Sequence, residues 1–332
     1  MAQIASWWHS GKDRITCGLC PQSCSMLEGN LGGCGARYVR DGKLWTRAFG
    51  VGTTPVADPV EKKPLYHFLP GTKVLSFGMA GCNLKCAFCQ NWSLSTSDNY
   101  DALPGLSPEK CVQTAIGQGC TAIAFTYNEP IIYSEFCIEV SRIARSAGIK
   151  TIAVSNGYIL EEPRTELFSV IDAVNIDLKG IVPEFYTKYC GARVEPVLET
   201  LRYLVHSSEA WVEITNLLIP GLNDSPRDID CLIDWICANL SLDIPLHFSA
   251  FHPAHRMESL QRTPISTLAM AKEKALGRGM RYVYLGNVSH PQDTMCPNCR
   301  NLAVRRLHFT VSEYQVRDGK CSRCGCAIAG IF

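Results

Sequence analysis

Cys82, Cys86 and Cys89 are the residues whose type and spacing most directly indicate chemistry, since three and two residues separate them. Three thiolates from one short loop can bind three irons of a four-iron–four-sulfur (4Fe-4S) cube and leave the fourth iron without a protein ligand. A cluster that only carries electrons would have four cysteine ligands, and structural zinc favours paired Cys-x2-Cys units. The spacing therefore predicts a 4Fe-4S cluster with an open iron, and a zinc site completed from elsewhere is the alternative.

A second cysteine group lies near the C-terminus of a chain that contains 18 cysteines. Cys296-x2-Cys299 and Cys321-x2-Cys324 have the spacing of a zinc ribbon, in which four thiolates close the metal shell. We therefore expect structural zinc there rather than an auxiliary Fe–S cluster. Cys326 follows closely and leaves the identity of the fourth ligand open.

A third group lies near the N-terminus, at Cys17, Cys20, Cys24 and Cys34. Its spacings of two, three and nine residues do not distinguish zinc from a second Fe–S cluster. Zinc would indicate scaffolding, whereas a cluster would indicate electron transfer. The other cysteines occur singly, which favours ordinary core positions for Cys111, Cys120, Cys137, Cys190, Cys231 and Cys237.

The composition of the 332-residue chain is that of a globular protein, with 46% hydrophobic residues, 19% charged residues and a net charge of +1. This balance predicts no extended basic face for nucleic acid. No run approaches the ~20 apolar residues of a membrane span, and the first residues are too polar for a signal peptide. A chain of this size needs no disulfides, so grouped cysteines indicate metal sites in a reducing compartment. We expect a cytoplasmic protein with no membrane association.

Short apolar runs alternate with helical patterns from about residue 72 to about residue 288. Strands are expected at Lys73–Phe77, Thr121–Thr126, Lys150–Ser155, Ala173–Leu178, Trp211–Leu218, Leu246–Phe251 and Tyr282–Leu285. Helices are expected at Ser107–Ile116, Ile131–Ala147, Pro196–His206, Arg227–Leu240 and Ser266–Gly277. Such alternation indicates βαβ units, and the number of repeats predicts an α/β fold built as a partial (β/α)6 TIM-like barrel.

We expect this barrel over residues 71–290. An N-terminal cysteine-rich, metal-binding segment would precede it at residues 1–70, and a C-terminal zinc-ribbon-like module would follow at 291–332. Reactive groups of such folds lie at the carboxyl ends of the strands. Cys82 comes just after the first predicted strand, so the site is expected at that end.

The segment Gly81–Trp92 (GCNLKCAFCQNW) resembles the cluster motif of the radical S-adenosylmethionine (SAM) superfamily. More closely, the chain resembles the pyruvate formate-lyase-activating-enzyme-like subgroup and, within it, the AmmeMemoRadiSam system enzymes. Nearly the whole chain carries the resemblance, through Cys17–Cys24, Asp58–Phe68, Thr126–Pro130, Asn175–Lys179 and the cysteine-bearing C-terminus. The resemblance implies that the open iron chelates the amino and carboxylate groups of SAM. One-electron reduction would then release methionine and a 5′-deoxyadenosyl radical.

The resemblance also implies roles for residues that end the second and third strands. Asn128 and Glu129 stand where the superfamily has a Gly-Gly-Glu stretch that contacts the SAM amino group, although both glycines are absent. The SAM contact is favoured for Glu129, and the alternative, which is compatible with it, is a role at the N-terminal dipole of the helix that follows. Ser155 and Asn156 resemble a ribose-proximal Thr-Asn-Gly, with Val154 in place of the preceding Asp of the activating enzymes.

Two later strands end in further candidates for SAM binding. Asp177 and Lys179 resemble the Asp-x-Lys motif that lies near the SAM carboxylate, and a structural salt bridge is the alternative. His252 ends the sixth strand and could face the adenine or the substrate. His247 lies inside that strand, and we expect a structural role for it.

The stretch before the first barrel strand is rich in side chains that could act on a ligand. Two alternatives are expected for Lys62, Lys63, Tyr66 and His67: they form a lid or bind substrate, or they make a solvated charge pair.

These observations predict a radical SAM enzyme of the oxidoreductase type, which takes a hydrogen atom from its substrate. A low-potential electron donor, flavodoxin or ferredoxin, is implied. The substrate could be a backbone glycine of a partner protein, as for the activating enzymes, or a small molecule. One alternative is a catalytically silent Fe–S and zinc scaffold, against which the intact cysteine motif argues. The other is an RNA-modifying radical SAM enzyme, which the neutral charge disfavours.

Overall fold

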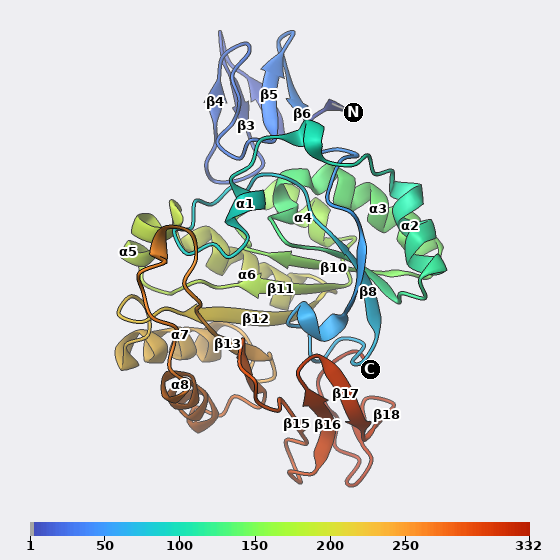
Figure 1. Ribbon diagram of the computed structural model, residues 1–332, viewed down its shortest axis with the longest axis vertical. Helices are drawn as coiled ribbons and strands as arrows, with labels where there is room; N and C mark the ends of the chain where they lie inside the picture. The colour runs from blue at the N-terminus through green and yellow to red at the C-terminus, as the bar shows by residue number, and fades with distance from the viewer. Residues whose placement is uncertain (1–2) are drawn as a thin grey trace.

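A computed structural model describes residues 3–332 and has an eight-stranded sheet at its centre (Figure 1). The strand order is β14-β13-β12-β11-β10-β9-β8-β7, in which β8 to β14 are parallel and β7 is antiparallel to β8. The bounds are β7 Val56–Pro59, β8 Lys73–Phe77, β9 Ala122–Phe125, β10 Lys150–Ser155, β11 Ala173–Asp177, β12 Trp211–Leu218, β13 Leu246–Ala250 and β14 Val283–Gly286. Because the outer strands β7 and β14 do not pair with each other, the described sheet is an open, partial barrel.

A helix follows each of the strands β8 to β13 before the next parallel strand begins. These helices are α2 Pro108–Gly117, α3 Ser134–Ser146, α4 Glu161–Phe168, α6 Glu195–Ser207, α7 Pro226–Asn239 and α8 Ile265–Gly277, with the short α1 Trp92–Ser95 and α5 Pro183–Phe185. Parallel strands with both faces covered are near-continuous apolar runs, and β9 is buried at every position. The predicted α/β partial barrel is confirmed. No helix within residues 3–332 has the length and apolar character needed to cross a bilayer.

The N-terminal residues form two small antiparallel sheets, of order β2-β3-β4 and β1-β6-β5, at one end of the molecule (Figure 1). Their strands are β1 Gln3–Ile4, β2 Trp8–Ser10, β3 Ile15–Cys17, β4 Ser25–Met26, β5 Arg37–Arg40 and β6 Lys43–Thr46. The buried Arg37 pairs with Glu135 of α3 at 2.6 Å, and Gln22 donates to the carbonyl of Gly191 at 2.9 Å. These contacts fix the segment on the barrel. The boundary at residue 70 stays a prediction, and β7 is the part of residues 1–70 that joins the central sheet.

The C-terminal residues form a separate small sheet at the opposite end of the molecule in Figure 1. Its order is β15-β16-β17, and a two-stranded ribbon of β18 and β19 follows. The bounds are β15 Thr294–Met295, β16 Leu302–Leu307, β17 Thr310–Tyr314, β18 Val316–Arg317 and β19 Lys320–Cys321. The two cysteine-rich ends of the chain therefore lie on different sides of the barrel.

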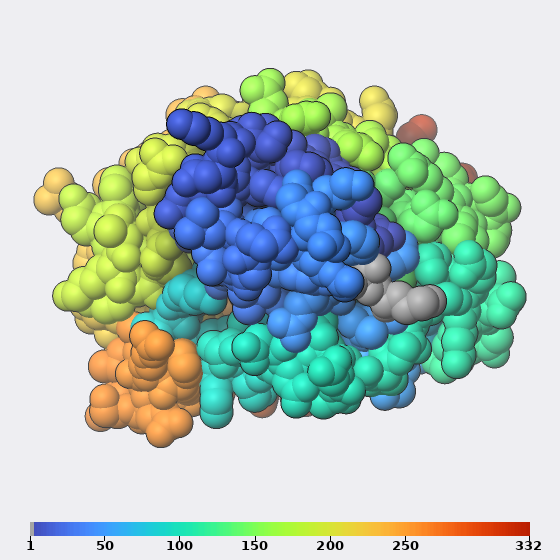
Figure 2. Space-filling model, turned by 90° about the horizontal axis from the view of Figure 1, so that it is seen from above, coloured from blue at the N-terminus to red at the C-terminus, as the bar shows by residue number. Residues whose placement is uncertain are grey.

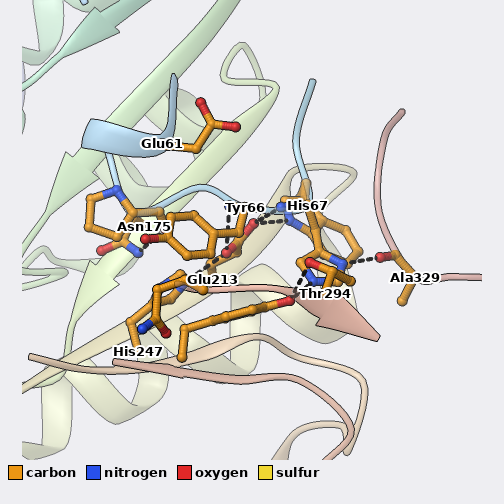
Figure 3. A network of polar contacts seen from close by, with 12 residues as sticks. Glu61, Tyr66, His67, Asn175, Glu213, His247, Thr294 and Ala329 are labelled. Carbon is orange, nitrogen blue, oxygen red and sulfur yellow. Dashed lines mark hydrogen bonds and ion pairs between the residues drawn. The ribbon is translucent and has the colours of Figure 1, made fainter. Parts of the chain in front are cut away.

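The segment after β7 turns into the barrel near the amino ends of the strands (Figure 3). The backbone N–H groups of Tyr66 and His67 donate to the carboxylate of Glu213 on β12 at 3.0 and 2.7 Å. That carboxylate also accepts from the Nε2 of His247 at 2.7 Å and from the indole of Trp211 at 3.1 Å. Glu213 and His67 are fully buried. The structural role predicted for His247 is confirmed.

The buried residues Tyr66 and His67 are called the plug below. A chain of hydrogen bonds connects this plug to the C-terminal module. Arg306 donates to the hydroxyl of Thr294 at 2.7 Å, which bonds to the Tyr284 hydroxyl at 2.7 Å. The Tyr284 hydroxyl lies 2.6 Å from the Nε2 of His67, and the Nδ1 of His67 lies 2.6 Å from the Ala329 carbonyl. Because a carbonyl only accepts, Nδ1 carries the proton and Nε2 accepts from Tyr284. The neutral His67 ring is therefore the form that fits.

The expected lid is not found, because the plug residues face inward. Tyr66 and His67 are buried among barrel side chains, so neither can close over a ligand at the carboxyl ends of the strands. Lys63 is 2% exposed and pairs with Asp58 at 2.8 Å. Only Lys62, 46% exposed and paired with the same carboxylate at 2.8 Å, resembles the expected solvated pair. The lid expectation was wrong because distant C-terminal residues cover this stretch.

Acid is expected to destabilise the fold through His67. Burial lowers the pKa of His67 to about 4, from the ordinary 6.5, so the unfolded state binds more protons between these values. The stability is therefore complete above about pH 6.5 and falls as the pH drops towards 4, by up to ~3 kcal/mol. Urea unfolding at about pH 7 and about pH 5 would measure this loss. The variant His67→Gln should lose this part of the pH dependence. If the free energy of unfolding changed with pH equally in both proteins, His67 would not be the group responsible.

Candidate functional site

The loop that follows β8 carries Cys82, Cys86 and Cys89, all partly accessible. The Sγ of Cys82 accepts from the Leu84 N–H at 3.4 Å, and the Sγ of Cys89 lies 3.6 Å from the Ser95 hydroxyl. Burial raises the pKa of Cys82 and Cys89, and the pKa of Cys82 is raised further by Glu129 and Cys86. The three thiols thus lie within electrostatic reach of one another, and a bound cation is needed to hold them as thiolates.

Asn128 holds the start of the cysteine loop. Its Oδ1 accepts from the Met79 N–H at 2.9 Å and its Nδ2 donates to the Gly81 carbonyl at 3.0 Å. The residue before it, Tyr127, has a φ of 70°, which turns the chain at the end of β9. A Cβ on Gly78 would lie 2.3 Å from the Thr126 carbonyl oxygen, so this close approach requires glycine. The structure places Asn128 as a support for the loop.

Glu129 joins the carboxyl ends of β9 and β10. One carboxylate oxygen accepts from the Ser155 hydroxyl at 2.7 Å and the Ile131 N–H at 3.1 Å, and the other accepts from the Asn156 N–H at 2.7 Å. The contact with Ile131 is the helix-capping role that was the alternative for Glu129. Although its hydrogen-bond donors oppose the effect, burial raises the pKa of Glu129 to about 7. One oxygen with a single donor remains able to accept another.

Asn156 extends this network to the cysteine loop. Its Nδ2 donates to the Oδ1 of Asn83 at 2.8 Å and lies 3.9 Å from the Sγ of Cys82. The Nδ2 of Asn83 in turn donates to the Tyr158 carbonyl at 2.8 Å. The structure therefore brings Ser155, Asn156, Glu129 and Cys82 into one connected group.

Asp177 and Lys179 lie at the end of β11 and form the ion pair considered above, with a distance of 2.9 Å. Burial acts to lower the pKa of Lys179, but Asp177 and Cys86 outweigh it, so this pKa lies well above its usual value. The charge of Lys179 also opposes the rise that burial causes in the pKa of Cys89 and of Glu129. The ammonium of Lys179 therefore faces the same space as the cysteine loop.

His252 follows β13 and is partly exposed, and within the described residues its ring makes no hydrogen bond. Its loop nevertheless contacts the cysteine loop, since the Arg256 N–H donates to the Ala87 carbonyl at 3.0 Å. The ring of His255 stacks on Trp92 with centroids 5.5 Å apart. The loop after β13 thus forms one edge of the site.

The N-terminal cysteines surround a small cavity next to this site. Cys17, Cys20, Cys24 and Cys34 all line it, together with Arg37 and Asn83 among others. Figure 2 shows the N-terminal segment lying over this face of the molecule, beside the residues that carry the cysteine loop.

The C-terminal cysteines converge on a single point. The sulfurs of Cys296, Cys299, Cys321 and Cys324 all lie within 4.8 Å of one another. Cys296 and Cys324 are separated by 3.6 Å, and Cys299 and Cys321 by 3.8 Å. The Cys326 sulfur instead contacts the Ala327 carbonyl at 3.5 Å, so the structure resolves which four thiols come together.

Comparison with known proteins decides the family. The sequence model of the radical SAM superfamily matches residues 77–231. A relative from Methanocaldococcus jannaschii, named Uncharacterized protein MJ0808, is 40% identical over 319 residues, which are 94% of this chain and 94% of that protein. This chain belongs to the radical SAM superfamily.

Other relatives are named for activities that differ from one another. A pyruvate formate-lyase-activating enzyme from Listeria monocytogenes is 29% identical over 179 residues, 50% of this chain and 70% of that protein. A GTP 3′,8-cyclase from Aeromonas hydrophila is 25% identical over 244 residues, 71% of this chain and 68% of that protein. The solved structure of a radical SAM methyltransferase from Sphaerobacter thermophilus is 16% identical, with a TM-score of 0.52 over 66% of this chain and 67% of that one. It supports the radical SAM fold.

The donor set at the cysteine loop fits the 4Fe-4S cluster and SAM of the radical SAM superfamily. Three thiols face a space that also contains a carboxylate, Glu129, and an ammonium, Lys179. Among the described residues, the C-terminal thiols lie close enough together to hold a single ion. Cys82, Cys86 and Cys89 do not form such a group. Wide spacing is expected of ligands to separate irons of a cube. The carboxylate and the ammonium are complementary to the amino and carboxylate groups of SAM.

Two features of this radical SAM site were missed by sequence reasoning. Cys190, counted as a core cysteine, lies beside Cys86, and its thiol is the main cause of the raised Cys86 pKa. The carbonyls of Tyr189 and Cys190 accept from the N–H groups of Ala87 and Lys85, both at 2.8 Å. These residues end a π-helical turn, Tyr186–Cys190, that backs the cysteine loop. Its sequence carries no signal that distinguishes it from an ordinary helix end.

Proposed function

We propose that this protein binds a site-open 4Fe-4S cluster through Cys82, Cys86 and Cys89 and cleaves SAM reductively to take a hydrogen atom from its substrate. The observation that supports this best is the connected group at the strand ends, in which Glu129 fixes Asn156 and Asn156 reaches the cysteine loop. Such a network positions cofactor-binding groups on rigid strands. When bound, the cluster and SAM supply the one-electron chemistry that yields a 5′-deoxyadenosyl radical.

The residues of this chain would orient SAM. Glu129 accepts from the SAM ammonium through the carboxylate oxygen that has a single protein donor. Lys179, held by Asp177, donates to the SAM carboxylate. Ser155 and Asn156 line the ribose side, and His252 lies on the loop at the adenine or substrate side. Asn128 positions the loop through its two backbone contacts, and the second N–H of its amide stays available to SAM.

A more specific proposal is that the protein activates a glycyl radical enzyme in the cytoplasm, with flavodoxin or ferredoxin as electron donor. The relationship to a pyruvate formate-lyase-activating enzyme supports it. Pyruvate formate-lyase can serve as the probe protein, and a glycyl radical signal in electron paramagnetic resonance (EPR) after addition of SAM and reductant would be the expected result. Absence of that signal from an enzyme that cleaves SAM would direct the search to small molecules.

Loss of the three loop cysteines is expected to abolish SAM cleavage. The protein is reconstituted anaerobically with iron and sulfide, reduced with dithionite and supplied with SAM, and 5′-deoxyadenosine is quantified. The triple variant Cys82→Ala/Cys86→Ala/Cys89→Ala should give no product above background. The matched control Cys231→Ala/Cys237→Ala removes thiols of which neither is fully buried and should behave as wild type. Equal product from wild type and the triple variant, or none from wild type with cluster and SAM bound, would refute the proposal.

We also propose that the C-terminal thiols bind structural zinc. Zn–S bonds of ~2.3 Å in a tetrahedron place neighbouring sulfurs ~3.8 Å apart, which matches the spacings of 3.6 and 3.8 Å. Metal analysis is expected to find about one zinc per chain in wild type and none at this site in Cys299→Ala, with reduced thermal stability. The control Cys326→Ala should retain the metal. Equal zinc loss in both variants would contradict the ligand assignment.

A further inference from the structure

The N-terminal cysteines are arranged differently from the C-terminal ones, although each group has four thiols. Within the described chain, the C-terminal thiols form a group close enough to hold one ion, and the N-terminal thiols do not. Instead Cys17, Cys20, Cys24 and Cys34 stand around a cavity. A single zinc ion draws its ligands together, whereas a cube of four irons holds them apart around itself.

A buried cation lines the same cavity. Arg37 is 1% exposed, and its Nε has no hydrogen-bond partner in the part of the chain that the structure describes. Its other nitrogens donate to the Ser6 carbonyl at 2.7 Å and to Glu135 at 2.6 Å. Arg37 also acts electrostatically on Cys17 and Cys34. A buried, unpartnered N–H of a guanidinium beside thiols suits an anionic group with several acceptor atoms, which a thiolate-ligated Fe–S cube provides.

The cavity adjoins the loop that carries the SAM-binding cluster. Asn83 lines it, and the Cα atoms of Asn83 and Cys82 are ~3.8 Å apart as chain neighbours. A Cβ on Gly81 would lie 2.2 Å from the Cys34 carbonyl oxygen, so the two cysteine segments are in direct backbone contact. A group held in the cavity would therefore be a near neighbour of the group held by Cys82.

We infer that Cys17, Cys20, Cys24 and Cys34 hold a second 4Fe-4S cluster, which relays electrons to the cluster on Cys82, Cys86 and Cys89. This inference rests on the proposed function for the role of the relay, but not for the identity of the metal. Four thiolates close the shell of this cluster, so it carries electrons without binding SAM. A reduced flavodoxin or ferredoxin gives one electron to the second cluster. That cluster passes the electron to the first and returns to its oxidised state.

The test keeps the N-terminal segment intact and removes the other iron site. Wild type and the variant Cys82→Ala/Cys86→Ala/Cys89→Ala are reconstituted anaerobically, and iron, acid-labile sulfide and zinc are measured. Wild type is expected to hold about eight irons, eight sulfides and one zinc, and the triple variant about four, four and one. Adding Cys24→Ala to the triple variant should remove the remaining iron. Circular dichroism would show that this variant is folded.

Each other result overturns the inference. Two zincs and no iron in the triple variant would show that the N-terminal site binds zinc. Four irons in wild type that are all lost in the triple variant would assign all of the iron to the cluster on Cys82, Cys86 and Cys89 and rule out the second cluster. If wild type cleaves SAM but holds only four irons, the proposed function survives and the inference fails.

EPR separates the relay from mere iron binding. Two reduced clusters in neighbouring segments are expected to broaden each other's signals in wild type. That broadening should vanish both in the triple variant and in the single variant Cys24→Ala, each of which retains one cluster. Signals that simply add, with no mutual broadening in wild type, would overturn the relay.

Discussion

Replacement of Glu129 by glutamine is expected to slow 5′-deoxyadenosine formation by roughly 100-fold, since truncating one partner of a buried charge contact costs ~2–5 kcal/mol. Glutamine removes the charge that would meet the SAM ammonium. Of the two carboxylate oxygens, one accepts from Ser155 and Ile131 and the other only from Asn156. The NH2 group of glutamine takes the place of one of these oxygens and cannot accept from the donor that it then faces. The contact with Asn156 or with Ser155 is therefore weakened.

The measurement is a rate of 5′-deoxyadenosine formation together with SAM affinity and iron content. Iron should stay at the wild-type level, because Glu129 is not a thiol ligand, while SAM binding weakens. The matched control is Glu139→Gln on α3, whose side chain is 47% exposed and lies outside the connected group. A Glu129→Gln enzyme with wild-type rate and affinity would remove Glu129 from the SAM site and leave it a helix cap.

Replacement of Gly81 by alanine is expected to detach the N-terminal segment from the cysteine loop. Gly81 has a φ of 88°, and an added Cβ would lie 2.2 Å from the Cys34 carbonyl oxygen. The left-handed backbone alone costs about 1–2 kcal/mol for a residue with a side chain. Relief of the backbone clash requires the two segments to move apart, so we expect a total loss of more than ~3 kcal/mol in the free energy of unfolding.

The control for Gly81 is Gly29→Ala in the same N-terminal segment. Gly29 has a φ of 78°, and nothing lies within 4 Å of its Cβ position, so this variant reports the backbone cost alone. Chemical unfolding of both variants separates the clash from the strain. Equal losses in the two variants would show that the contact between Gly81 and Cys34 does not hold the segments together.

The barrel could be predicted because its signals are local. The parallel strands are mostly apolar in sequence, and the helix that ends before Gly148, where φ is 72°, has a common glycine terminator. Helix α4 was not predicted, because Glu161–Phe168 contains two leading acids and a proline and shows little amphipathic pattern. Its position is set by packing against neighbouring elements.

The candidate site could be predicted only as a list of residue types. The sequence points to Cys82 and Glu129 through their positions after strands, but it does not show that Asn128 binds backbone groups of Met79 and Gly81. Nor does it place Cys190 against Cys86. Such contacts join segments that are far apart in the chain, and they depend on how strands stand side by side.

The plug has a consequence for the order in which the chain folds. The ring of His67 bonds to Ala329, 262 residues away, and the His67 carbonyl accepts from the Ile331 N–H at 2.7 Å. During synthesis the parallel strands can pair in sequence, since each lies next to its predecessor. The buried His67 can obtain its full set of partners only when Ala329 and Ile331 have left the ribosome. Barrel closure at the amino end is therefore expected to be a late, slow event, because contacts of such separation carry a high entropic cost before they form.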